Sequence, residues 1–200
     1  MPSPAFPGLF FAFCAMVLLI FVSVSPPAWE KINFLKASVN NQTTVFGVLG
    51  ECLKGGGGEC TAKNVGYDLK VWGADNLNIN TTNFHRLTRA LILHPIAGFF
   101  ALLSLLFGAL ATLCASRFLT IMMALSALFG LLITIAAFVL DMVFWTLVKH
   151  KIRDAGYSAS YGNANWLTAG ALAAFALSFC TSLCGAFGRF ASGRFAGEKV

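Results

Sequence analysis

The stretch from Thr43 to Tyr67, TTVFGVLGECLKGGGGECTAKNVGY, decides the fold, because it holds two cysteines and four consecutive glycines in one polar segment. Residues 43–48 are rich in β-branched and aromatic side chains, which is typical of a half-buried strand. The glycines at 55–58 supply a turn without side-chain constraints. A second short strand is expected over residues 65–71, where apolar side chains alternate. The segment therefore predicts a β-hairpin.

Cys52 and Cys60 flank the glycine turn with seven residues between them, close enough for a disulfide if the strands pair. A disulfide implies an oxidising compartment. Two alternatives stay open, namely free thiols in a cytosolic loop and half of a metal site. Neither a further Cys nor a His lies at zinc-finger spacing, so we favour the disulfide.

The composition identifies the kind of molecule that carries this hairpin. The 200 residues are 58% hydrophobic and 11% charged, and the mean hydropathy is +0.76, whereas soluble domains have roughly 25% charged residues. The chain is therefore predicted to be an integral membrane protein. Its net charge of +6 comes from scattered residues that form no stripe interleaved with aromatics, which argues against nucleic-acid binding.

Four apolar runs predict four transmembrane helices, at about residues 6–24, 91–115, 118–148 and 166–187. The third would rise about 46 Å, which exceeds a hydrocarbon core of about 30 Å, so part of it must project from the bilayer. The predicted fold class is an all-α membrane protein, a single four-helix transmembrane bundle over residues 1–200 with a small disulfide-bonded extracellular β-hairpin or sheet.

The large loop, residues 26–90, is predicted to be extracellular. Asn41 and Asn80 each begin a sequon for N-glycosylation, and the candidate disulfide lies between them. Residues 149–161 then form a short polar connection on the same side, and both termini, including the tail 188–200, are cytoplasmic. Trp145 and Trp166 are expected at the outer membrane interface, in an aromatic belt.

Small residues repeat along two of the predicted helices at spacings that allow close helix packing. They are Ser126, Gly130 and Thr134 in the third span, and Gly170, Ala174, Ser178, Ser182 and Ala186 in the fourth. We favour packing within one bundle, and a seam between copies of a homo-oligomer is the alternative.

A resemblance to a known family rests on three stretches. They are Phe46-Gly47-Val48-Leu49-Gly50-Glu51-Cys52 followed by Cys60, Gly66-Tyr67-Asp68-Leu69, and Leu87 to Ala97 with His94-Pro95 at its centre. Together they resemble the fungal PalI family, which with its eisosome-associated relatives belongs to the claudin-like four-span group. Leu49 stands where the wider group has tryptophan, a departure that disfavours a claudin-type paracellular function.

The resemblance implies a plasma-membrane protein of the ambient-pH response, which helps a seven-span pH receptor reach or stay at the cell surface. The implied partners are membrane lipids and a polytopic receptor. Relatives organise static plasma-membrane domains, so a structural organiser that self-associates into homo-oligomers is the alternative function.

Asp141 interrupts an apolar run, where acidic side chains are costly and usually paired. Counting along the helices places it at about the height of His94, with Arg89 just above. A protonation-sensitive contact between Asp141 and His94 is one reading, because histidine changes charge near pH 6.5. The reading we favour is that Asp141 pins the loop through an arginine.

The remaining cysteines lie in or beside apolar spans. Cys114, Cys180 and Cys184 are near the predicted cytoplasmic helix ends, where thioester lipidation is a candidate modification and helix packing is the favoured alternative. Cys14 is expected to be packing. Neither a nucleophile motif, nor a metal-protease motif, nor a phosphate or dinucleotide loop occurs, so the sequence predicts no catalysis, no metal and no cofactor.

Overall fold

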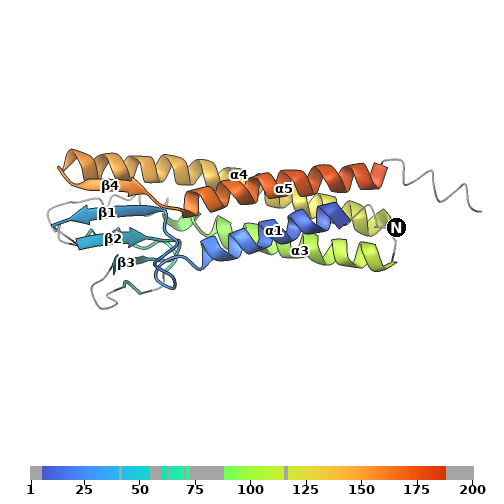
Figure 1. Cartoon of the computed structure of the whole chain (residues 1–200), viewed down its shortest axis with the longest axis horizontal. Coiled ribbons are helices and arrows are strands. Elements are labelled where there is room, and N and C mark those ends of the chain that lie inside the picture. Colours follow the sequence, from blue (N-terminus) through green and yellow to red (C-terminus); the bar gives the residue numbers. More distant parts are fainter. Residues whose placement is uncertain are drawn as a thin grey trace, which may run out of the picture. The chain divides into compact units, whose positions relative to one another are not determined.

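The computed structural model describes residues 6–40, 42–54, 60–62, 64–69, 71–72, 88–114 and 117–187. Four helices lie in these segments: α1 (Phe6–Ser23), α3 (Leu93–Cys114), α4 (Arg117–Asp154) and α5 (Ala164–Phe187). The four strands are β1 (Leu35–Val39), β2 (Gln42–Phe46), β3 (Glu51–Lys54) and β4 (Ser158–Tyr161), as Figure 1 shows.

The chain divides into two units, which we call the helical unit and the sheet unit. Among the described residues the helical unit comprises 6–18, 96–134 and 170–187, and the sheet unit lies within Leu19–Pro95 and Ile135–Ala169. Each of the four helices contributes residues to both units.

All four helices are long and apolar enough to cross a membrane, over Phe6–Ser23, Thr88–Cys114, Phe118–Asp154 and Ala164–Gly185. The predicted four-span class is confirmed. α4 ends at Asp154, six residues later than expected. Lys151 and Arg153 lie in its last turn, where cations stabilise the helix dipole.

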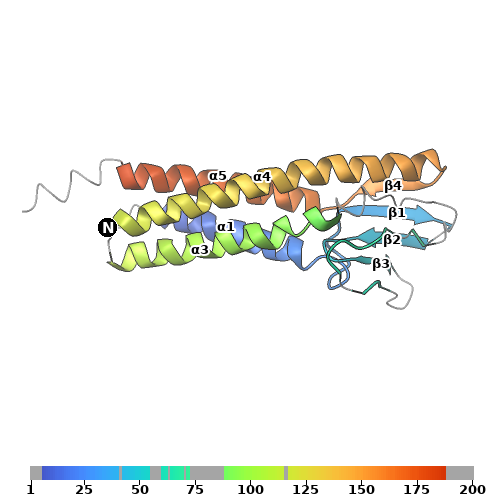
Figure 2. The same ribbon diagram turned by 180° about the vertical axis from the view of Figure 1, so that it is seen from behind.

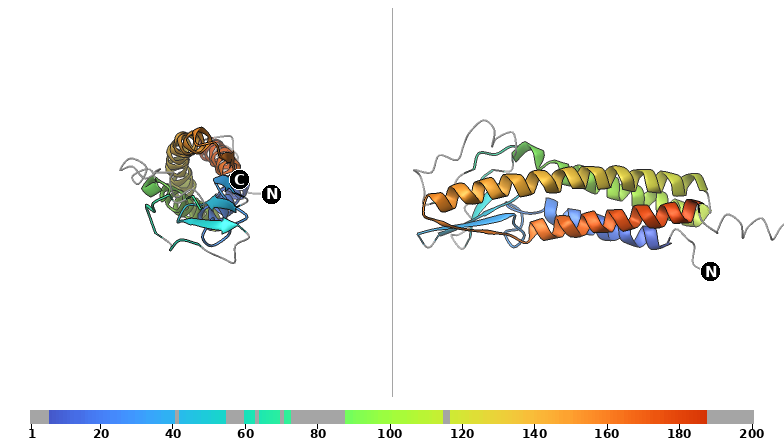
Figure 3. Two further views of the ribbon diagram at one scale, coloured as in Figure 1. Left: turned by 90° about the vertical axis from the view of Figure 1, so that its left-hand side faces the viewer. Right: turned by 90° about the horizontal axis from the view of Figure 1, so that it is seen from above.

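Gly156 ends α4 with φ +85°. The Gly156 amide donates to Arg153 O and the Tyr157 amide to Ile152 O, the bond pair of a Schellman motif. The chain then turns back into β4, as the right-hand view of Figure 3 shows.

In the helical unit the small residues of α4 and α5 face other helices of the same chain. Ser178 Oγ donates to Gly8 O at 2.9 Å, and a Cβ added to Gly8 would lie 2.6 Å from Ser182 Oγ. A Cβ on Gly130 would overlap the ring of Phe175. Figure 2 shows these helices running side by side. The small faces thus permit close packing within one bundle, as we favoured.

The sheet unit holds one antiparallel sheet with the order β3-β2-β1-β4. β1 pairs with β2 through Ala37↔Thr44 and with β4 through Ala37↔Ala159. The residues that we expected to be a mere connection, 149–161, therefore supply an edge strand. In Figure 1, β4 lies directly beside β1.

The predicted second hairpin strand over 65–71 is wrong. The described residues there form no strand. β3 pairs with β2, and its one further partner among the described residues is Cys60, through the isolated bridge Cys52↔Cys60. The alternation that suggested a strand has another cause, since Tyr67, Leu69 and Val71 are all buried in the core of the sheet unit. Alternate side chains of this irregular segment thus pack into the core, although its backbone forms no strand.

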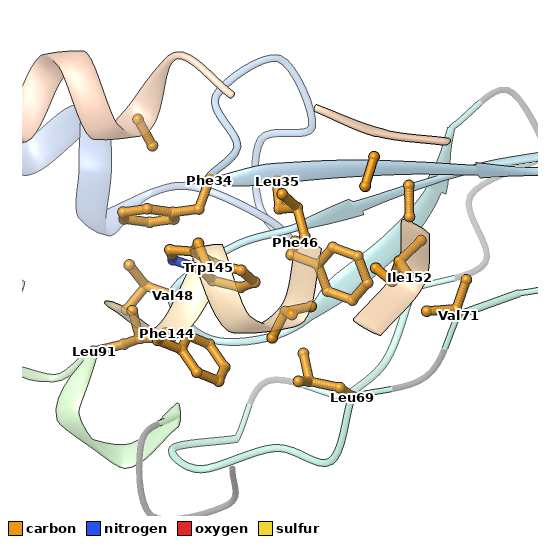
Figure 4. Close-up of a cluster of buried hydrophobic side chains, with 14 of the residues drawn as sticks. Phe34, Leu35, Phe46, Val48, Leu69, Val71, Leu91, Phe144, Trp145 and Ile152 are labelled. Carbon is orange, nitrogen blue, oxygen red and sulfur yellow. The ribbon is translucent and has the colours of Figure 1, made fainter. Parts of the chain in front are cut away.

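Trp145 is at the centre of that core and has no exposed surface. Its ring stacks on Phe34 at 5.7 Å and lies 5.8 Å from Phe46 and 4.6 Å from Phe144. Figure 4 shows the indole between the side chains of Phe34 and Phe46. The expected place of Trp145 in an interfacial belt is therefore wrong, whereas Trp166 is 76% exposed.

Candidate functional site

The Cys52–Cys60 disulfide is confirmed, with an S–S distance of 2.01 Å. Glu30 and the two sulfurs lie within 4.8 Å of one another, a spacing that would suit a metal ion. The sulfurs are bonded to each other and so offer no thiolates. The disulfide reading of this pair thus holds against the metal reading.

The motif residues around the disulfide fix the loop against the end of α1. Tyr67 Oη donates to Gly47 O at 2.8 Å, and the Val48 amide donates to Ser25 Oγ at 2.9 Å. A Cβ on Gly47 would overlap the backbone of Pro26. Glycine is required here because two backbone segments meet without room for a side chain.

Two further motif glycines have similar roles. Gly66 has φ +77°, and a Cβ there would overlap the side chain of Arg89. A Cβ on Gly50 would lie 2.8 Å from Thr61 Oγ1, which accepts a hydrogen bond from the Glu51 amide. Phe46 is buried, whereas Asp68 and Pro95 are exposed. Most of the family motif therefore builds the sheet unit.

Tyr67 provides a test of this packing at alkaline pH. Burial, and then the nearby Glu51 carboxylate, raise the pKa of the phenol well above its usual value of 10. The unfolded chain ionises near pH 10 and the folded chain does not, so this stabilisation is complete below pH 10 and is lost as the pH rises further.

We therefore expect the apparent melting temperature (Tm) to fall more steeply above pH 10 in the wild type than in Tyr67→Phe, which cannot ionise. At neutral pH the variant should be less stable by about 1–3 kcal/mol, because Gly47 O loses its donor. Thermal unfolding of both proteins from pH 8 to 11 checks this. Parallel curves above pH 10 would contradict it.

The sheet unit also buries a polar contact between helices. His94 Nε2 lies 3.0 Å from Asp141 Oδ2, with the two side chains 0% and 4% exposed. Thr168 Oγ1 is 3.4 Å from the same nitrogen. The other ring nitrogen, Nδ1, is 3.0 Å from Leu91 O. Residues of α3, α4 and α5 thus meet at one imidazole.

The partners of the imidazole determine how many protons the pair holds. A carbonyl oxygen only accepts, so Nδ1 carries a proton toward Leu91. Thr168 Oγ1 donates to Ala164 O at 3.1 Å, which uses its one proton. His94 Nε2 and Asp141 Oδ2 are close, but their alignment is not that of an ideal hydrogen bond. A proton on one of these two atoms prevents their lone pairs from facing each other. With the proton on either atom, the pair has no net charge, which reduces the cost of burial.

Removing the carboxylate tests the pair. We expect Asp141→Ala to cost about 1–3 kcal/mol, because a buried imidazole nitrogen loses its closest partner. Asp141→Asn should cost clearly less, since the amide can still donate to Nε2. Thermal unfolding of both variants in detergent checks the order. Equal losses would show that the negative charge is essential and not the hydrogen bond.

The other predicted residues have varied places. Arg89 lies against Gly66, and among the described side chains His94 contacts Asp141. Cys114, Cys180 and Cys184 are exposed on the helical unit and Cys14 is half-buried there. Both sequon asparagines, Asn41 and Asn80, lie outside the described residues.

Sequence reasoning missed two polar residues at the start of α5. Asn165 Nδ2 donates to Phe34 O at 3.0 Å, and Thr168 reaches His94. Both are almost fully buried. The sequence feature that could have identified them is their spacing. Two polar side chains three residues apart lie on one helix face, here at the start of an apolar run.

Comparison with known proteins agrees with this architecture. No curated protein matches the chain. The model of the SUR7/PalI family matches residues 4–183. Four apolar helices, an antiparallel sheet and the disulfide fit a claudin-like four-span fold, so the protein is a multi-pass membrane protein. Since the match covers most of the 200 residues, the chain belongs to the SUR7/PalI family.

Proposed function

We propose that this protein is a non-catalytic accessory subunit of ambient-pH signalling, which stabilises a polytopic pH receptor at the plasma membrane. Membership of the SUR7/PalI family supports a role of this kind. In this proposal the sheet unit is extracellular and both termini are cytoplasmic. The protein acts by binding and has no reaction of its own.

One observation favours a receptor helper over an organiser that self-associates. The small-residue faces of α4 and α5 contact helices of the same chain, through Gly130 against Phe175 and Ser178 against Gly8. Close helix contacts in lipid depend on such faces. Because these faces are already used, they are not available as a seam between copies.

A deletion strain tests the proposal. We expect poor growth at mildly alkaline pH and reduced proteolytic processing of the pH-responsive transcription factor, both restored by the intact gene. Normal processing with altered tolerance of wall stress would favour the organiser. A His94→Gln copy separates structure from sensing, since an unchanged pH response would remove histidine protonation from the mechanism.

The same strain tests the disulfide. Cys52→Ser opens the covalent loop between residues 52 and 60, and loop-closure entropy predicts a loss of about 2–3 kcal/mol. We expect a smaller amount of protein at the cell surface, measured by surface biotinylation, and partial complementation. Cys14→Ser, at a half-buried free thiol, is the matched control. Full complementation by Cys52→Ser would contradict the prediction.

A further inference from the structure

α4 presents an exposed apolar stripe that is too long for a bilayer. Its exposed side chains recur every three to four residues from Phe118 to Leu147. At the rise of an α-helix the stripe is about 44 Å long, against a hydrocarbon core of about 30 Å. Even at a tilt of about 40°, the upper end of the usual range, the stripe extends about 34 Å along the bilayer normal.

The neighbouring helix supplies an internal scale. The exposed stripe of α3 runs from Ile92 to Leu113 and measures about 32 Å, which matches the bilayer. Only two residues separate the end of α3 at Cys114 from the start of α4 at Arg117. Both stripes therefore begin at the same membrane surface, and that of α4 continues about 12 Å further.

The part of the α4 stripe that exceeds the α3 stripe comprises Val139, Val143 and Leu147, which are 54%, 52% and 48% exposed. They lie four residues apart, on one helix face. If α4 runs along the bilayer normal, Val139 reaches the edge of the hydrocarbon layer and Val143 and Leu147 lie beyond it, whereas at a tilt of about 40° Leu147 alone does. Apolar side chains in a row outside the lipid are typical of an interaction surface.

Charged residues follow the stripe at once. Lys151, Arg153 and Asp154 are exposed in the last turn of α4, as is the neutral His150 before them, so this turn carries a net positive charge. On the flank, Thr146 Oγ1 and Tyr161 Oη are 2.8 Å apart, and Lys149 Nζ lies 3.9 Å above the Tyr161 ring. The surface is thus apolar near the membrane and basic further away.

An apolar stripe followed by basic residues favours some binding partners over others. A second copy in the same membrane has the same orientation, so a two-fold contact along the stripe would bring the two net-positive ends of α4 close together. Like charges facing each other oppose association. A helix with acidic residues at that height would instead be attracted.

We propose that the stripe of Val139, Val143 and Leu147, with the basic end of α4, docks a transmembrane helix of another membrane protein. That helix extends beyond the bilayer with apolar side chains and then carries Asp or Glu. The inference rests on the proposed accessory role and names the chemistry of the partner.

The first experiment measures where the stripe lies. A fluorescent amino acid is introduced by codon suppression at Leu147 in the full chain, reconstituted in phosphatidylcholine vesicles. Leu132, 53% exposed on the same helix, is the matched control position. We expect aqueous iodide to quench position 147 and acyl-brominated lipid to quench position 132. Quenching of position 147 by brominated lipid would overturn the proposal.

The second experiment measures the partner chemistry. The probe is a synthetic peptide with a Leu/Ala membrane-spanning helix, two further apolar turns and three Glu, and its control has three Lys in their place. Energy transfer from the labelled full chain should show at least about tenfold tighter association with the Glu peptide, equivalent to 1.4 kcal/mol. Leu147→Ser should weaken association with the Glu peptide, and Leu132→Ser should leave it unchanged.

Two results would overturn the docking proposal: equal association of both peptides, or stronger transfer between differently labelled copies of the chain than to the Glu peptide. These measurements use purified protein. Their failure therefore leaves the pH phenotype untouched, and a normal phenotype of the deletion strain would leave the docking surface intact.

Discussion

Replacing Trp145 with alanine is expected to cost about 3–5 kcal/mol and to lower the Tm by about 6–20 °C. The indole has no exposed surface and contacts Phe34, Phe46 and Phe144. Phe34 directly precedes β1, Phe46 ends β2 and Phe144 lies in α4, so the cavity would open where sheet and helix meet. The measurement is the monodisperse fraction after heating in detergent, by size-exclusion chromatography.

Trp166→Ala is the matched control for Trp145→Ala, because the same atoms are removed from a side chain that is 76% exposed. A surface substitution of this kind should shift the Tm by less than about 2 °C. Similar losses for the two variants would mean that the aromatic cluster is not the centre of the stability of the sheet unit.

The two tryptophans show what the sequence could predict. Four spans followed from the length of the apolar runs, and the disulfide from two cysteines around a turn, since both are local features. Whether Trp145 or Trp166 faces lipid is not local. Each turn of a 38-residue helix has one side that can be buried and one that can be exposed. The position of the sheet decides on which of these sides Trp145 lies.

The contact between Asp141 and His94 could be predicted in part from the sequence. The height of Asp141 and His94 could be counted along straight helices at a fixed rise, and the structure brings the two together. An arginine was the favoured partner of Asp141, and the structure places His94 beside it. Height alone does not give the direction in which each side chain points.

The sheet was only partly predictable. β2, apart from Gln42, and β3 lie within the quoted stretch, but β1 and β4 pair across the chain, with Ser38 opposite Ser158. Four residues of β4 in a polar connection carry too little pattern to identify a strand. Pairing over this sequence distance depends on how α4 returns the chain, which follows from the Schellman turn at Gly156.

Gly162→Ala should therefore have a large effect at a position that no motif marks. A Cβ there would overlap the carbonyl oxygen of Asn33, and that segment cannot easily move. The Gly162 amide donates to Phe34 O at 2.8 Å, and the Ala164 amide donates to Asn33 O at 3.0 Å. We expect a loss of about 3 kcal/mol, at the upper end of ordinary overpacking, and a Tm lower by about 6–12 °C.

Gly170→Ala is the control, since its Cβ would meet only the flexible end of Leu18, at 3.3 Å. Alanine also favours a helix interior over glycine, so this variant should keep or slightly raise the Tm. Equal, small effects of both substitutions would show that the chain near Asn33 yields to Gly162→Ala. A large loss at Gly162 alone would mean that the close approach of two backbones, distant in sequence, joins β4 to the rest of the sheet unit.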